Sequence, residues 1–270
     1  MIKITRFFKY FDYYMETFAK RLSGRSHMNP YKNGEYAVLN NLLKKKKNKK
    51  FCFFDGGSNI GNHLIYFNKI CKEQGIADSI IYAAEPFPAS LKSLKLSIYL
   101  NKVNCKIFPV ALGSAEKKIN FYYMKKNISS GANSSFPHLY LKNRMKVEQI
   151  TLDKIIIENK IEKIDFLKLD IEGMEYEALL GAKNSLSNNI ISYIQLEYNQ
   201  TWIEGGASIK KILGICEEFN FKLFRINRAS LVSIPRYDFN LEDFCYSNLL
   251  LVKNGKPLPL PCYKKALPYL

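Results

Sequence analysis

The stretch FFDGGSNIGNH, residues 53–63, decides the fold, because an apolar run leads through an acid and glycines into a helical pattern. The run before Asp55 is short, aromatic and apolar on both faces, which is typical of a strand buried on both sides of a parallel sheet. The glycines that permit a tight turn and a close approach of the backbone to a ligand are Gly56, Gly57 and Gly61. In an open α/β sheet, the crevice at such a turn binds cofactors.

Further apolar runs predict the rest of the sheet. They are residues 79–84, 106–112, 164–169, 190–196, 221–226 and 246–252. Helical repeats separate most of these runs, but the link between residues 227 and 244 has none, so the last strand is expected to be antiparallel, at or near the sheet edge. The sequence predicts an α/β fold with a seven-stranded, mostly parallel sheet and helices on both faces, and it leaves the extended run 119–124 outside that sheet.

Acids end the predicted parallel strands. Asp55, Glu85 and Asp170 each follow such a strand, and Glu197 follows a fourth. Because the carboxyl ends of parallel strands face one crevice, we expect these side chains to lie together. The glycine pattern is G-x-S-x-x-G with an aspartate directly before it, and this negative charge argues against a pyrophosphate. S-adenosylmethionine carries a sulfonium, an ammonium and a ribose diol, which acids can bind, and we expect Glu85 to accept the ribose hydroxyls.

Several motifs in order resemble one family. They are DGGSNIGNH, AAEPFP, VALGS, GANSSF, TLD and DFLKLDIEGMEYEALLGA, which cover roughly residues 50 to 200. Together they are similar to the FkbM family of S-adenosylmethionine-dependent methyltransferases. The resemblance implies the class I methyltransferase (Rossmann-like) fold, with a reversed last strand. It also implies methylation of hydroxyl groups on sugars, lipid-linked glycans or polyketides. Ser58 departs from the alanine that is usual in the family.

The resemblance assigns the site residues. It matches Asp170, Glu172 and Gly173 to the D-x-E-G motif of the family. The predicted cofactor-binding residues are Asp55, Gly56, Gly57, Ser58, Asn59, Gly61, Glu85, Pro86 and Asp170. Methyl transfer requires that the acceptor oxygen be held close to the methyl group and that a proton be removed.

Asp170 is the first candidate for the base or for the group that orients the acceptor, and Glu197, His63 and His138 compete with it. Three of these four residues also have a structural interpretation: Asp170 as a helix cap, His63 as a packed side chain and His138 as an exposed loop residue. We predict no metal site, although carboxylates at residues 170, 172 and 197 would suit magnesium. Tyr198 and Trp202 could stack on a sugar ring or pack in the core.

The chain is expected to divide into three parts. Residues 1–45 would form an amphipathic helix and a connector, residues 46–256 the methyltransferase domain and residues 257–270 a C-terminal tail. The aromatic and basic helix at residues 2–22 is typical either of packing, on its own domain or on a second subunit of a homodimer, or of peripheral contact with the inner face of a membrane.

Composition defines the alternatives. Lys+Arg 41 against Asp+Glu 24 gives a formal net charge of +17, which motivates an RNA methyltransferase or an inactive basic binding module as competing interpretations. Nucleic acid is the weaker expectation, because no aromatic loop for a flipped base follows the fourth strand, and the preferred acceptor is a small molecule or glycan. Scattered cysteines and the lack of a long apolar run predict a cytoplasmic protein.

Overall fold

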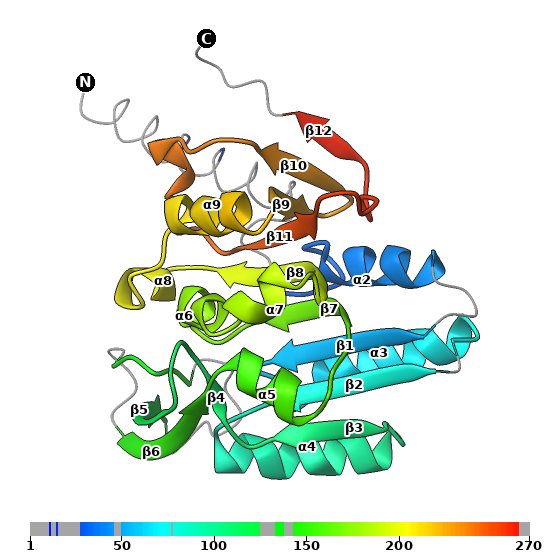
Figure 1. Ribbon diagram of the computed structural model, residues 1–270, viewed down its shortest axis with the longest axis vertical. Coiled ribbons are helices and arrows are strands. Elements are labelled where there is room, and N and C mark those ends of the chain that lie inside the picture. Colours follow the sequence, from blue (N-terminus) through cyan, green and yellow to red (C-terminus); the bar gives the residue numbers. More distant parts are fainter. Residues whose placement is uncertain are drawn as a thin grey trace.

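The computed structural model describes residues 11, 15, 28–45, 50–76, 78–124, 133–137 and 143–264 of the 270-residue chain. Its centre is a nine-stranded sheet with the strand order β12-β10-β9-β11-β8-β7-β1-β2-β3 (Figure 1). The strands of this sheet are β1 (Phe51–Gly56), β2 (Ser79–Ala84), β3 (Cys105–Phe108), β7 (Ile164–Leu169), β8 (Ile191–Tyr198), β9 (Phe221–Asn227), β10 (Ser230–Ile234), β11 (Ser247–Lys253) and β12 (Cys262–Lys264).

The sheet is mostly parallel, as the apolar runs predict. β1 lies between β2 and β7 and is parallel to both, and β8 is parallel to β7. β11 is antiparallel to β8 and to β9, so the predicted reversed strand is confirmed. Its predicted place at or near the sheet edge is wrong, because β11 inserts between β8 and β9, and β9, β10 and β12 lie beyond it.

The predicted count of seven strands is also too low. β10 pairs antiparallel with β9, and β12 pairs parallel with β10. β10 comes from the link that lacks a helical repeat, where Ser230 and Ser233 interrupt the apolar residues. A short, partly polar edge strand carries little periodic signal, which is why the link did not predict it.

A second, three-stranded sheet lies beyond the carboxyl ends of β1 and β2 (Figure 1). It consists of β4 (Ala111–Leu112), β5 (Lys117–Tyr123) and β6 (Asn143–Ile150). The predicted strand 106–112 is divided between β3 and β4, with Pro109 between them, because proline cannot donate a ladder hydrogen bond. Residues 119–124 are confirmed as extended and outside the main sheet, since β5 pairs with β6.

Helices cover both faces of the main sheet. They are α2 (Glu35–Lys44), α3 (Asn62–Glu73), α4 (Pro88–Leu100), α5 (Leu152–Glu158), α6 (Glu175–Leu180), α7 (Lys183–Ser187), α8 (Thr201–Glu204) and α9 (Ile209–Glu218), with a 3-10 turn at Phe239–Leu241. Phe53 packs in a core with Leu39 of α2 and Phe67 of α3. Phe54 packs in the opposite core with Leu179 of α6. Neighbouring strand residues therefore face different helix layers, as a doubly covered sheet requires.

Much of the N-terminal segment lies outside the described residues. Of the predicted helix at residues 2–22, only Phe11 and Met15 are described, both helical and about half exposed. Within the described part of the chain, no helix is both long enough and apolar enough to cross a bilayer. Membrane contact and homodimer formation stay predictions.

Candidate active site

The glycine loop after β1 is held tightly against β7. Gly57 has a φ of +80°, and a Cβ atom there would overlap the carbonyl oxygen of Asp170. Its N–H donates a hydrogen bond to the carbonyl oxygen of Ala84 at 2.9 Å, which ties the loop to β2. Gly61, with a φ of +90°, begins α3. The loop therefore needs glycine at residue 57 for conformation and for space.

Asp55 is buried in the strand directly before this loop. Asp55 is 1% exposed, and its Oδ1 atom has no hydrogen-bond partner among the described residues. Burial raises the pKa of Asp55, although the nearby charges of Lys168 and His63 act in the opposite direction. A buried carboxylate oxygen without a donor is suited to a cationic ligand that brings its own donors.

Glu85 follows β2 and faces the same crevice. Its Oε2 accepts the backbone N–H of Asn59 and its Oε1 that of Phe87, each at 2.9 Å. Burial raises the pKa of Glu85 to about 7, although these two N–H groups lower it. Each oxygen has a second lone pair, so the carboxylate can also accept two ribose hydroxyls.

Gly57 and Glu85 line a cleft with about 550 Å³ of empty space, part of which is open to solvent. Of the predicted cofactor residues, those that line it are Gly57, Asn59, Glu85, Pro86 and Asp170. Asp55, Gly56, Ser58 and Gly61 form the loop and strand around it. Ser58 donates its hydroxyl hydrogen bond to the carbonyl oxygen of Asp55 at 2.6 Å, so it stabilises the turn. The cleft, its carboxylates and the unpartnered oxygen of Asp55 in the adjoining strand together fit S-adenosylmethionine.

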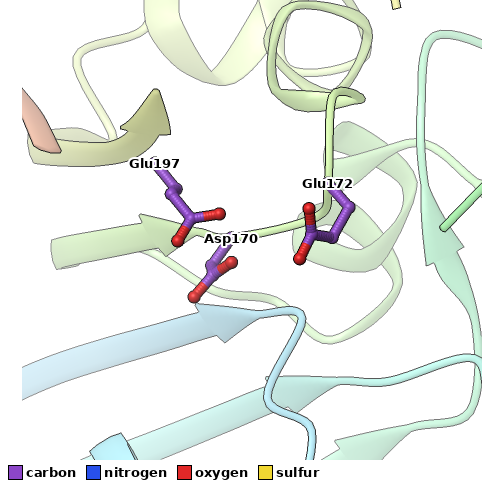
Figure 2. A group of neighbouring side chains, drawn as sticks. All are labelled: Asp170, Glu172 and Glu197. Carbon is purple, nitrogen blue, oxygen red and sulfur yellow. The ribbon is translucent and has the colours of Figure 1, made fainter. Parts of the chain in front are cut away.

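Three carboxylates meet at the ends of β7 and β8. Figure 2 shows Asp170, Glu172 and Glu197 with their carboxyl groups turned toward one another, and one oxygen of each lies within 4.8 Å of the others. Burial and the charge of Asp170 raise the pKa of Glu172 to about 8. Burial, Asp170 and Glu172 raise the pKa of Glu197 well above its ordinary value. Such a cluster favours a cation, which is either the cofactor's sulfonium and ammonium or a metal ion.

Two charged residues that the sequence analysis missed hold this cluster. Lys168 is only 2% exposed, and its Nζ lies 2.7 Å from Oδ2 of Asp170. Burial would lower the pKa of Lys168, but Asp170, Asp55 and Glu35 raise it above its ordinary value. Glu175 accepts the N–H groups of Ile171 at 2.9 Å and Gly173 at 3.0 Å. The sequence does contain a signal for Lys168, because a lysine inside the apolar run IDFLKL indicates a buried charge that needs a partner.

The remaining candidates are placed differently. His63 lies outside the cofactor cleft, in a neighbouring cavity, where its Nε2 is 3.1 Å from Oε2 of Glu35. His138 lies outside the described residues. Tyr198 and Trp202 are fully buried, and the Trp202 indole N–H donates to the carbonyl oxygen of Glu197 at 2.8 Å. Stacking of these two rings on a sugar is therefore excluded, and the packing interpretation is correct.

The mostly parallel sheet with the reversed strand β11, the glycine loop and the acid after β2 define a class I S-adenosylmethionine-dependent methyltransferase. Residues 55–223 match a family model described as the methyltransferase FkbM domain. The chain therefore belongs to the FkbM methyltransferase family, and its cofactor is S-adenosylmethionine.

The chain is also similar, at low sequence identity, to one characterised methyltransferase and to several solved structures. The hexuronic acid methyltransferase AglP of Haloferax volcanii is 22% identical over 197 residues, which are 72% of this chain and 74% of AglP. TrmK of M. capricolum, solved with S-adenosyl-homocysteine, is 16% identical with a TM-score of 0.39, over 85% of this chain and 70% of TrmK. The putative RNA methyltransferase PH1948 of Pyrococcus horikoshii is 12% identical with a TM-score of 0.38, over 82% and 83% of the two chains.

Proposed function

We propose that this methyltransferase transfers the methyl group to a hydroxyl of a sugar, a glycan or a similar small acceptor. The observation that carries the proposal is that two cavities meet at Asp170. The cofactor cleft and a second cavity share Gly57, Asn59 and Asp170 in their walls. An acceptor in the second cavity would therefore reach the cofactor cleft beside the carboxylate cluster.

The second cavity suits an acceptor with a ring and several hydroxyl groups. It is an open hollow of about 1460 Å³, open solvent included, between the segment before α2, helix α3 and the glycine loop. Tyr31, which is 68% exposed, and Tyr66 lie in its wall with Lys69. Exposed aromatic rings beside polar side chains can bind the apolar face and the hydroxyls of a sugar.

When bound, S-adenosylmethionine supplies an electrophilic methyl group on a sulfonium. The protein has to hold the acceptor oxygen about 3 Å from that carbon and keep water out. We assign to Asp170 the role of orienting the acceptor hydroxyl; this is supported by its place in the walls of both cavities and by Lys168, which binds its Oδ2 atom. Glu85 and Asp55 would hold the ribose and the cationic end of the cofactor.

The similarity to AglP supports an acceptor of the glycan type, because that relative is by name a methyltransferase of hexuronic acids. A hexuronic acid offers hydroxyls on a ring together with one carboxylate. Lys69 in the wall of the second cavity could bind such a carboxylate.

Labelled methyl transfer tests the proposal. The purified protein and S-adenosylmethionine with a labelled methyl group are added to a cell extract, which is then separated into glycan, lipid, RNA and protein fractions. We expect base-stable label in the glycan fraction, as an ether requires, and a strong loss of label with Asp170→Asn. Glu116→Gln, on the surface, is the control. Label confined to RNA or protein would contradict the proposal, and base-labile label would indicate an ester instead.

A further inference from the structure

A buried polar cluster joins helix α2 to helix α3 beneath the second cavity. Glu35, the first residue of α2, is only 5% exposed, and three side chains contact its carboxylate. The amide of Asn33 donates to Oε1 at 2.5 Å, and that of Gln195 donates to Oε2 at 2.7 Å. The third contact is the one from Nε2 of His63 to Oε2 at 3.1 Å. Oε1 of Glu35 is thus held by its own turn, and Oε2 is held by neighbours from α3 and β8.

Glu35 is ionised in this setting. Burial alone would raise its pKa, but the hydrogen bond and charge of His63, together with Lys168 and Asn33, lower the pKa of Glu35 to about 2. An ionised carboxylate can only accept hydrogen bonds. The short contact with Nε2 of His63 therefore requires a proton on that nitrogen, because two lone pairs would otherwise face each other.

The contact fixes the tautomer of His63. A neutral imidazole carries one proton, so a proton on Nε2 leaves Nδ1 as a lone pair that can accept another. The ring is also oriented by an edge-to-face contact with Tyr36, at 5.3 Å between ring centroids. His63 lies in the wall of the second cavity together with Asp170 and the glycine loop. In the neutral ring, Nδ1 is therefore the proton-accepting atom of a residue that lines the cavity we assign to the substrate.

The other candidates are less suited to removing a proton. Asp170 is bound to the ammonium group of Lys168 at 2.7 Å. Glu172 and Glu197 lie within the carboxylate cluster, and neither of them lines the second cavity. Glu35 itself is buried and fully hydrogen-bonded. Among these candidates, His63 combines a place in the wall of the acceptor cavity with a ring that Glu35 and Tyr36 hold in position.

We propose that His63 is the general base of methyl transfer and that Glu35 is the positioning residue that sets its tautomer. The inference rests on the proposed function. As the acceptor oxygen attacks the methyl carbon, the O–C bond forms and the C–S bond breaks, with its electron pair left on sulfur. The hydroxyl proton passes to Nδ1 of His63, and Glu35 offsets the positive charge of the imidazolium. Glu35 precedes the matched residues 55–223, so a segment outside the family domain would complete the site.

Nitrogen NMR of the histidine rings tests the positioning role without any acceptor. The chain has three histidines, and loss of one signal set in His63→Gln assigns the ring. We expect the tautomer with the proton on Nε2 in the wild type and a changed tautomer in Glu35→Gln, whose amide can donate to Nε2. Glu35→Asp should restore the wild-type tautomer, and Glu73→Gln, an exposed acid on α3, should not change it. A proton on Nδ1 in the wild type, or an unchanged ring in Glu35→Gln, overturns the inference.

Turnover tests the base. The substrate in this assay is the extract fraction that the wild type methylates. His63→Gln and Glu35→Gln should lower kcat about 10²- to 10⁴-fold, with little change in affinity for S-adenosylhomocysteine. Added imidazole should partly restore transfer in His63→Ala. Retention of more than about a tenth of wild-type kcat in His63→Gln overturns the assignment. If the wild type methylates no hydroxyl, the proposed function fails and the base with it, while the NMR result still decides the role of Glu35.

Discussion

Replacing Glu85 by glutamine removes a charge from the cofactor cleft without changing the size of the side chain. In the protein, both carboxylate oxygens accept backbone N–H groups, from Asn59 and Phe87, at 2.9 Å each. Glutamine has one acceptor oxygen, and its NH₂ group cannot accept, so one of these N–H groups would face another donor. A buried donor left without a partner costs about 1–3 kcal/mol.

Glu85→Gln should also weaken cofactor binding, because it removes the charged acceptor of the ribose hydroxyls. A hydrogen bond to a charged group contributes about 1.5–3 kcal/mol, which corresponds to a Kd about 10- to 150-fold higher. We expect this loss of affinity for S-adenosylhomocysteine in Glu85→Gln. An analogue without the two ribose hydroxyls should bind the wild type more weakly, and Glu85→Gln should bind the analogue and the parent ligand almost equally.

Isothermal titration calorimetry measures both ligands. Glu116→Gln is the matched control, because Glu116 is exposed and pairs with Lys154 outside the cleft. Circular dichroism checks that each variant is folded. The reasoning is refuted if folded Glu85→Gln binds S-adenosylhomocysteine within about threefold of the wild type. It is also refuted if loss of the ribose hydroxyls weakens binding equally in both proteins.

Three further predictions follow from the loop and the buried charges. Lys168→Met should lower the free energy of unfolding by about 3–5 kcal/mol, because it leaves buried carboxylates unpaired. Lys69 is exposed, so Lys69→Met should change the free energy of unfolding by less than about 0.5 kcal/mol, and denaturant unfolding measures both variants. Gly57→Ala should abolish binding of S-adenosylhomocysteine in the same titration, since its Cβ would overlap a carbonyl oxygen, and normal affinity would contradict the loop geometry. The affinity for S-adenosylmethionine should rise between about pH 6 and pH 8.5. Above its raised pKa of about 7, Glu85 is ionised and accepts the ribose hydroxyls, and below its raised pKa of about 8, Glu172 holds a proton that the sulfonium must displace. S-adenosylhomocysteine has the ribose but no sulfonium, so its affinity should rise less, and equal pH profiles of the two ligands would refute this reasoning.

Most of the fold could be predicted because its signals are local. The aromatic run before Asp55 identifies a strand covered on both faces, and the glycines after it identify the turn. The alternation of strands and helices predicts that the inner strands are parallel. β10 and the place of β11 could not be predicted, because a short, partly polar strand such as Ser230–Ile234 lacks periodicity, and strand order at the reversed end depends on long-range pairing.

The sequence by itself determined that acids stand at the ends of parallel strands, and Glu85 and Asp170 do line one cleft, with Asp55 buried in the strand beside it. Only the tertiary structure decided what each acid contacts. Glu35 and His63 are 28 residues apart and meet because α2 packs beside α3, and Lys168 is charged in the core because three carboxylates surround it. Periodicity assigns a side chain to a face, but the packing of distant elements chooses its partner, and the partner determines its chemistry.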